Sequence, residues 1–181
     1  MNVKKYMPSI VEHTIYDVDF QKVYDSGKRY ILIDIDNTLL PYDEYDANDK
    51  IKELVFNLQK KGFKIILISN NHTKRVKRFA ESVNLDYIAN ALKPLKFGFK
   101  KAYKRFGRPD KKEIISVGDQ IVTDVFGSNR FKIDVILVHP IKKKSEKWYT
   151  KINRHFERKA IKKISKVNPI LYQEIKEKHE Y

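Results

Sequence analysis

Cysteine is absent from this 181-residue chain, so neither a disulfide bond nor a thiolate metal site is available to it. A bound metal would therefore need oxygen or imidazole ligands. The longest apolar stretches, such as residues 65–68 and 135–138, fall far short of the roughly 20 residues that span a bilayer. The first residues also lack the apolar core of a secretory signal. We therefore expect a cytoplasmic protein, either soluble or peripherally attached to the inner face of the membrane.

Negative charge is scarce: the chain has 38 lysines and arginines but only 23 acidic residues, which gives a net charge of +15 and a pI near 9.7. Such a field concentrates phosphate-bearing molecules at the surface and favours an anionic partner or substrate. Much of the excess lies in residues 142–166, where eleven basic residues accompany only Glu146 and Glu157. Charge alone does not distinguish nucleic acid from lipid.

Internal repeats and Gly/Ser-rich linkers are also missing, and 41% of the residues are hydrophobic. We therefore expect residues 1–181 to form one domain, with a core over about residues 28–140. Residues 141–181 are expected to form a basic helical extension. Residues 8–26 resemble an N-terminal packing segment rather than a tail.

Strand and helix patterns alternate along the core, which predicts an α/β fold: a doubly wound, mostly parallel, five-stranded sheet with helices on both faces. The expected strands are residues 30–35, 64–69, 87–89, 113–117 and 135–139. The expected helices are residues 48–61, 73–83, 95–106, 121–130 and 145–166. Pro94 suits a first helical position in the third of these.

Four aspartates lie at the ends of apolar runs: Asp34, Asp36, Asp119 and Asp124. In an open α/β sheet, ligands collect beyond the carboxyl ends of the strands. Carboxylates gathered there repel one another, so the arrangement usually requires a cation or a proton. The pattern therefore indicates metal-dependent chemistry.

Four polar clusters follow the expected strands or open the next helix. They are Asp34-Ile35-Asp36-Asn37-Thr38, Ser69-Asn70-Asn71, Lys93-Pro94, and Gly118-Asp119-Gln120 with Thr123-Asp124. In type and order they resemble the motifs of haloacid dehalogenase (HAD) superfamily phosphatases. Their neighbours are similar to the subclass IIIA branch, which includes YqeG-type proteins and phosphatidylglycerophosphate phosphatases. Four motifs in one order are far more specific than any one alone.

This resemblance implies a role for each motif. Asp34 would be the nucleophile that forms an aspartyl-phosphate, and Asp36 would be the general acid and then the general base. Thr38 would orient the loop by hydrogen bonding. Ser69 and the Asn70 backbone N–H would bind phosphoryl oxygens.

The resemblance also implies a cationic contribution to the site. Lys93 would neutralise charge between the phosphate and the nucleophile. Mg²⁺ would be held by Asp34, the backbone carbonyl of Asp36 and Asp119, while Asp124 would bind it through water or hold Lys93. Outside the site, we expect Asn71 to cap the next helix, His72 to be exposed and His139 to be structural.

The spacing of the motifs leaves no room for a cap domain, since Asp34 and Ser69 are only 35 residues apart and Ser69 and Lys93 only 24. An open site should accept a phosphate carried by a membrane, a nucleic-acid end or a protein. The C-terminal stretch repeats apolar residues every four positions: Trp148, Ile152, Phe156, Ala160 and Ile164. This basic amphipathic helix either lies on an anionic bilayer or packs on the sheet with its basic face solvated.

Together these features favour an Mg²⁺-dependent phosphomonoester hydrolase acting on a phosphorylated, bulky anionic substrate. By resemblance, the best candidate is the lipid phosphatidylglycerophosphate, an intermediate of phospholipid biosynthesis, met at a membrane surface. Two alternatives remain. One is a polynucleotide-end or phosphoprotein phosphatase, and the other is a non-catalytic RNA- or ribosome-binding protein on a HAD fold.

Overall fold

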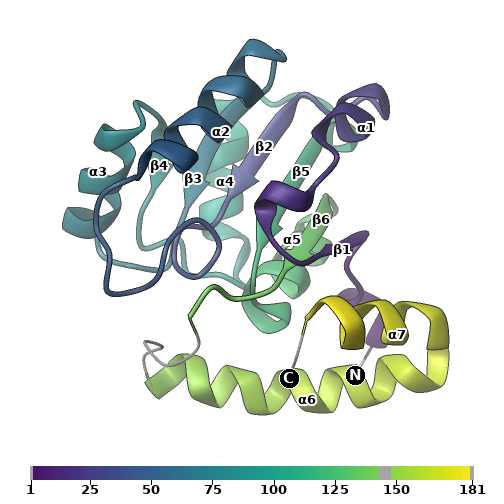
Figure 1. Cartoon of the computed structure of the whole chain (residues 1–181). Helices are drawn as coiled ribbons and strands as arrows, with labels where there is room; N and C mark the ends of the chain where they lie inside the picture. Colours follow the sequence, from purple (N-terminus) through teal and green to yellow (C-terminus); the bar gives the residue numbers. More distant parts are fainter. Residues whose placement is uncertain (1, 143–147, 180–181) are drawn as a thin grey trace.

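The computed structural model describes residues 2–142 and 148–179, with the backbone alone for residues 148–154 (Figure 1). Its sheet has six parallel strands in the order β1-β6-β5-β2-β3-β4. The strands are β1 Ile10–Glu12, β2 Tyr30–Ile33, β3 Lys64–Ile68, β4 Asp86–Ile88, β5 Ile114–Gly118 and β6 Asp134–Val138. The predicted α/β, doubly wound class is confirmed.

The strand count was predicted one too low, because β1 lies in the stretch expected to be a packing segment. This strand has only three residues and pairs at the sheet edge, Ile10 opposite Ile136. So short a run carries no recognisable alternation, and its pairing is specified by β6 rather than by its own sequence. Two short helical segments follow it, η2 Ile15–Asp17 and α1 Phe20–Asp25.

Helices cover both faces of the sheet, as its alternating side chains require. On one face, Ile31 and Ile33 of β2 pack with the apolar sides of α2 and α3. On the other face, Leu32 packs with Phe99 of α4 and Phe131 of α5. These helices are α2 Asp49–Lys60, α3 Thr73–Ser82, α4 Lys96–Arg105 and α5 Phe126–Phe131. Figure 1 shows α2 and α3 in front of the strands and α4 behind them.

Two predicted helix starts need correction. Pro94 is not a helical residue: the Lys93–Pro94 peptide is cis, and α4 begins at Lys96 after a tight turn. The helix expected over residues 121–130 opens with a π-helical turn, η4 (Ile121–Val125), and α5 begins only at Phe126. A π turn places its side chains differently from an α-helix and often marks a functional site.

The C-terminal segment forms two helices, α6 Trp148–Val167 and α7 Pro169–Lys178, which pack against each other (Figure 1). Ala160 and Ile164 of α6 are buried with Val11 of β1 and Leu137 of β6. This part of the apolar stripe therefore covers the domain, whereas Phe156 is exposed. The side chains of Trp148 and Ile152, and the predicted helical residues 145–147, lie outside the described residues.

Three short helical segments complete the structure: η1 Val3–Tyr6, η3 Lys111–Glu113 and the η2 segment named above. None of the helices in the described part of the chain is long and apolar enough to cross a membrane. The chain runs outward from β2 to β4, then returns to β5 beside β2. That reversal leaves a crevice beyond the carboxyl ends of β2 and β5, where α/β sheets bind ligands.

Candidate active site

Asp34 and Asp36 lie where β2 gives way to a tight loop. The Asp34 N–H still donates to Val117 O of β5, at 2.9 Å. Asn37 then adopts a left-handed backbone, φ +65°, a conformation that asparagine tolerates better than most residues. The turn leaves both aspartates lining one cavity of about 150 Å³. Ser69, Asn70, Asn71 and Lys93 also line this cavity.

Three carboxylates, two from the ends of β2 and β5 and one from η4, converge beneath the cavity. One oxygen from each of Asp34, Asp119 and Asp124 lies within 4.8 Å of the others, and all three residues are buried. Gly118 permits this approach, because a Cβ there would lie 2.4 Å from Asp124 Cγ. Oxygen donors at this spacing suit a hard divalent cation such as Mg²⁺. The described residues therefore fit the metal that the sequence predicts.

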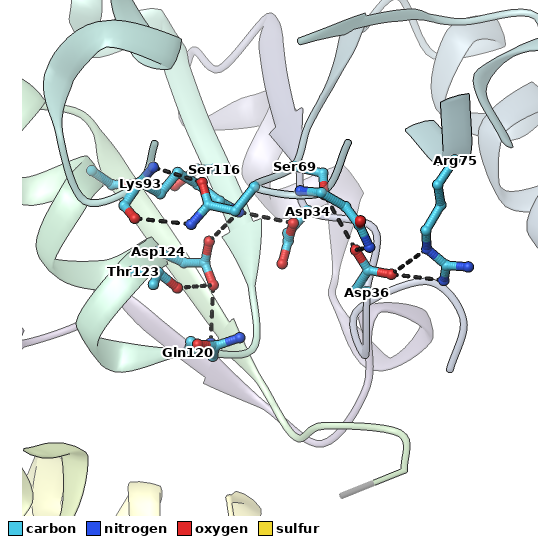
Figure 2. Close-up of polar contacts among 12 residues, drawn as sticks. Asp34, Asp36, Ser69, Arg75, Lys93, Ser116, Gln120, Thr123 and Asp124 are labelled. Atoms are coloured by element: carbon cyan, nitrogen blue, oxygen red, sulfur yellow. Dashed lines mark hydrogen bonds and ion pairs between the residues drawn. The ribbon is translucent and has the colours of Figure 1, made fainter. Parts of the chain in front are cut away.

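Lys93 bridges two of these carboxylates (Figure 2). Its Nζ lies 2.8 Å from Asp34 Oδ1 and 2.6 Å from Asp124 Oδ1. Of the two roles expected for Asp124, the contact with Lys93 is formed, and binding of Mg²⁺ through water stays a prediction. Asp124 is fixed further by the Gln120 N–H at 3.0 Å and the Thr123 hydroxyl at 3.2 Å, both donating to its Oδ2.

Burial dominates the electrostatics of the nucleophile position. Burial raises the pKa of Asp34 to about 7; the Lys93 ammonium opposes this shift, and the Asp124 and Asp36 carboxylates add to it. For Lys93, burial works to lower the pKa, but the attraction of Asp124 and Asp34 outweighs it and the pKa is raised. Lys93 therefore stays protonated, and its single positive charge is shared by the carboxylates of Asp34 and Asp124. The remaining negative charge is what a divalent cation would neutralise.

Arg75, which the sequence analysis did not single out, holds Asp36 (Figure 2). Its Nε and Nη2 lie 2.8 Å and 2.7 Å from Asp36 Oδ1. Its Nη2 also donates to Pro41 O at 3.2 Å, which ties the loop after the first motif to α3. Arg75 and Phe79 are one helical turn apart and both buried, so an arginine on the apolar side of α3 was the available signal.

The second carboxylate oxygen of Asp36 faces the second motif. Ser69 Oγ donates to Asp36 Oδ2 at 3.2 Å, and Asn71 Nδ2 donates to it at 3.4 Å. The predicted capping role of Asn71 is therefore wrong. The cap of α3 is His72, whose Nδ1 accepts from the Arg75 N–H, and His72 is exposed as expected. The Asn71 Oδ1 accepts instead from the adjacent His72 N–H at 2.9 Å, while its Nδ2 faces Asp36.

Asn70 positions the lysine through its side-chain amide. Asn70 Oδ1 accepts from the Lys93 N–H at 2.6 Å, and its Nδ2 donates to Lys93 O at 2.9 Å. The expected contact of Ser69 and the Asn70 N–H with a phosphoryl group stays a prediction. The Thr38 N–H donates within the loop to Ile35 O at 3.3 Å, but the Thr38 hydroxyl makes no loop hydrogen bond: it is buried and has no partner among the described residues. Thr38 is not among the residues that line the cavity.

The C-terminal helices reach the fourth motif from behind. Glu157 of α6 accepts from the Val122 N–H at 3.4 Å, and His179 Nε2 lies 3.0 Å from the Asp119 carbonyl oxygen. The His179 ring also stands edge-on to His139, with centroids 5.7 Å apart, in keeping with a structural role for His139. Glu157 and His179 therefore support the site from the C-terminal extension.

The residue types, their order and their convergence at one sheet edge define a class of enzyme. A family model described as haloacid dehalogenase-like hydrolase matches residues 3–131. The chain belongs to this family. The resemblance inferred from the motifs is confirmed.

A curated relative agrees with the family. The chain is 30% identical over 171 residues to "Probable phosphatase YqeG" of Bacillus subtilis (strain 168), covering 94% of this chain and 98% of that protein. Together with the family, this makes the chain a HAD-type phosphatase.

Two solved structures share the fold. An uncharacterized protein from Listeria monocytogenes serotype 4b is 23% identical with a TM-score of 0.51, covering 64% of this chain and 84% of its own. A hypothetical protein from Xanthomonas campestris is 12% identical with a TM-score of 0.50, covering 77% and 78%. At these identities the likeness extends to the fold alone.

Proposed function

We propose that this phosphatase is an Mg²⁺-dependent phosphomonoester hydrolase that acts through an aspartyl-phosphate on Asp34. The observation that carries the proposal is the contact of Lys93 with both Asp34 and Asp124 beside one cavity. A nucleophile, a fixed positive charge and an acidic group at the same cavity are the parts that phosphoryl transfer requires.

In this mechanism an Asp34 carboxylate oxygen attacks phosphorus, and the bond from phosphorus to the leaving oxygen breaks. Asp36, oriented by Arg75, Ser69 and Asn71, gives a proton to that leaving oxygen. It then takes a proton from the water that attacks the aspartyl-phosphate, which releases inorganic phosphate and restores Asp34. Bound at Asp34, Asp119 and Asp124, Mg²⁺ would supply positive charge to the phosphoryl oxygens.

Lys93 contributes a second, permanent positive charge at the same place. Its ammonium already contacts Asp34 Oδ1, so it would lie between the nucleophile and the phosphoryl oxygens as charge develops. Asn70 holds the backbone of Lys93 beside the cavity through its two hydrogen bonds to this residue. These residues therefore orient the phosphate before the reaction begins.

The substrate we propose is bulky and anionic, with phosphatidylglycerophosphate as the leading candidate. The chain between β2 and β3 contains a loop and α2, and the chain between β3 and β4 contains α3, so neither connection holds a cap domain over the cavity. A second hollow of about 520 Å³ shares Val122 with it. Its other lining residues are Tyr6, Phe156, Lys159, Lys162, Lys163 and Lys166. Apolar walls with four lysines suit a phosphorylated amphiphile.

The test is phosphate release from phosphatidylglycerophosphate in detergent micelles with Mg²⁺. Wild type should release phosphate, chelation should stop the reaction, and Asp34→Asn should reduce release to background. Phosphorylated peptides and polynucleotide ends in the same panel test the alternative phosphatase substrates. Wild-type rates from Asp34→Asn would exclude the nucleophile assignment, and release from polynucleotide ends alone would exclude the lipid.

A further inference from the structure

The loop that carries Lys93 exposes three large apolar side chains. Leu92, Leu95 and Phe97 are 54%, 51% and 47% exposed, within six consecutive residues. Single exposed apolar residues are normal on protein surfaces, but a group of large ones marks an interaction site. The neighbouring Lys93 is buried in the catalytic cavity, so the exposed group adjoins its rim.

A tight turn fixes this arrangement. The Leu95 N–H donates to Leu92 O at 2.7 Å, and the Lys93 and Pro94 between them line the cavity. The Gly98 N–H donates to Ala91 O at 3.0 Å, and a Cβ on Gly98 would lie 2.6 Å from Ala91 Cβ. Close packing at Ala91 and Gly98 therefore turns Lys93 inward and leaves the leucines outside.

Leu92 is also an unusual residue for its backbone position. Its φ is +55°, in the left-handed region where a bulky side chain is a genuine outlier. Glycine or asparagine would adopt this conformation at lower cost and would not expose apolar surface to water. Folding alone gives no reason for leucine here, which indicates a role for its side chain outside the domain.

The charges around the loop identify the kind of partner. The exposed residues that follow on α4 include Lys96, Lys100 and Lys101. Lys101 Nζ lies 4.3 Å from the centre of the Phe97 ring, so positive charge directly borders the apolar group. Leucines with flanking lysines suit the boundary between anionic headgroups and acyl chains, where apolar burial and electrostatic attraction add.

We propose that residues 92–97 form a docking loop that enters the surface of an anionic bilayer. Leu92, Leu95 and Phe97 reach the acyl boundary, and the lysines of α4 contact anionic headgroups. The cavity mouth beside Lys93 then faces the headgroup layer. This inference rests on the proposed function in one respect: it names the surface at which a lipid phosphate is presented.

Vesicle co-sedimentation tests the loop without any turnover. Vesicles of phosphatidylglycerol and phosphatidylcholine are compared with vesicles of phosphatidylcholine alone, using wild type and the variant Leu92→Asn/Leu95→Ser/Phe97→Ser. Wild type should bind the anionic vesicles. Partitioning of the variant should fall on the order of a hundredfold, because three large apolar side chains no longer leave water.

A matched control is Phe56→Ser on α2, which covers the opposite face of the sheet. Phe56 is 63% exposed, so the change also removes a large exposed apolar side chain. This variant should bind vesicles as wild type does. Equal binding by wild type and the loop variant overturns the proposal, as does failure of wild type to bind. An equal loss in Phe56→Ser also overturns it, since binding would then follow total surface hydrophobicity.

A gain of signal at the loop covers the case in which the triple variant does not fold. The chain has one tryptophan, Trp148, so Leu95→Trp in a Trp148→Phe background reports on the loop alone. Its fluorescence should shift to the blue with anionic vesicles and be quenched by lipids that carry a quencher on the acyl chain. An unchanged spectrum with bound vesicles overturns the proposal.

The outcomes separate this inference from the function on which it rests. Loss of vesicle binding in the loop variant, with no phosphate released from any lipid by wild type, would leave the docking loop standing and remove the lipid phosphatase. If wild type and the loop variant release phosphate from lipid micelles at the same rate and bind vesicles equally, the lipid phosphatase stands and the docking loop is removed.

Discussion

Replacing Arg75 with alanine should destabilise the protein strongly, because it leaves the Asp36 carboxylate buried beside an empty space. Arg75 and Asp36 side chains are 5% and 6% exposed, and two guanidinium nitrogens contact the same carboxylate oxygen. Removing one partner of a buried ion pair typically costs about 3–5 kcal/mol. Ser69 and Asn71 still donate to the other oxygen, so we expect a value near the lower end, about 3 kcal/mol.

Urea unfolding followed by circular dichroism measures this loss. At a typical urea dependence of the unfolding free energy, about 3 kcal/mol lowers the midpoint by about 1–2 M. Arg78→Ala is the matched control, since Arg78 lies on the same helix and pairs with Asp46 at the surface. An exposed pair of this kind contributes little, and the midpoint should barely move.

A double-mutant cycle identifies the cause. Asn at position 36 removes the buried charge, so Asp36→Asn should cost much less in the Arg75→Ala background than in wild type. Additive losses in the cycle, or a loss from Arg75→Ala no larger than that from Arg78→Ala, would refute the claim that Arg75 neutralises and orients Asp36.

Three further predictions concern Gly118, Asn70 and Asp34. Gly118→Ala should displace Asp124, lower kcat about a hundredfold and also lower the unfolding temperature, since the new Cβ would lie 2.4 Å from the buried Asp124 Cγ and small misplacements at a reacting centre have effects of this size; unchanged kcat would contradict the packing argument. Asn70→Ala should lower kcat on any phosphomonoester, because the Lys93 backbone loses both of its hydrogen bonds to the Asn70 side chain. Wild-type kinetics in this variant would show that Lys93 is positioned without Asn70. Metal-free protein should lose stability as pH rises from about 4 to 7, because folded Asp34, with its pKa raised to about 7, keeps a proton that the unfolded chain releases near 3.8. The unfolding temperature, measured in chelator, should fall with rising pH in wild type and not in Asp34→Asn. The same pH dependence in both proteins would contradict the raised pKa of Asp34.

The main strands and the candidate site follow from local sequence because each motif directly follows an apolar run. Carboxyl ends of parallel strands share one sheet edge, so Asp34 and Asp119 are adjacent once β2 and β5 pair. The Lys93 contact with Asp124 was expected from the resemblance, and the structure agrees. These features depend on the apolar pattern of the strands and on the order of the motifs, and both can be read from the local sequence.

Other features depend on contacts between distant residues and leave little trace in local pattern. Arg75 looks like one more basic residue of α3 until the 34–41 loop folds against it. The short strand β1 forms only because β6 offers an edge. The π turn at Ile121–Val125 and the exposed leucines beside Lys93 likewise result from packing around the site. Local propensity is too weak to decide such details when tertiary contacts compete.

In the proposed mechanism Asp34 carries the phosphoryl group during turnover. Quenching the enzyme with substrate and Mg²⁺, then reducing with borohydride, converts an aspartyl-phosphate to homoserine, which peptide mass spectrometry locates. We expect homoserine at position 34, in wild type and only when both substrate and metal are present. Active enzyme with its phosphoryl group on another residue, or with residue 34 unmodified under conditions that trap the intermediate elsewhere, would contradict it.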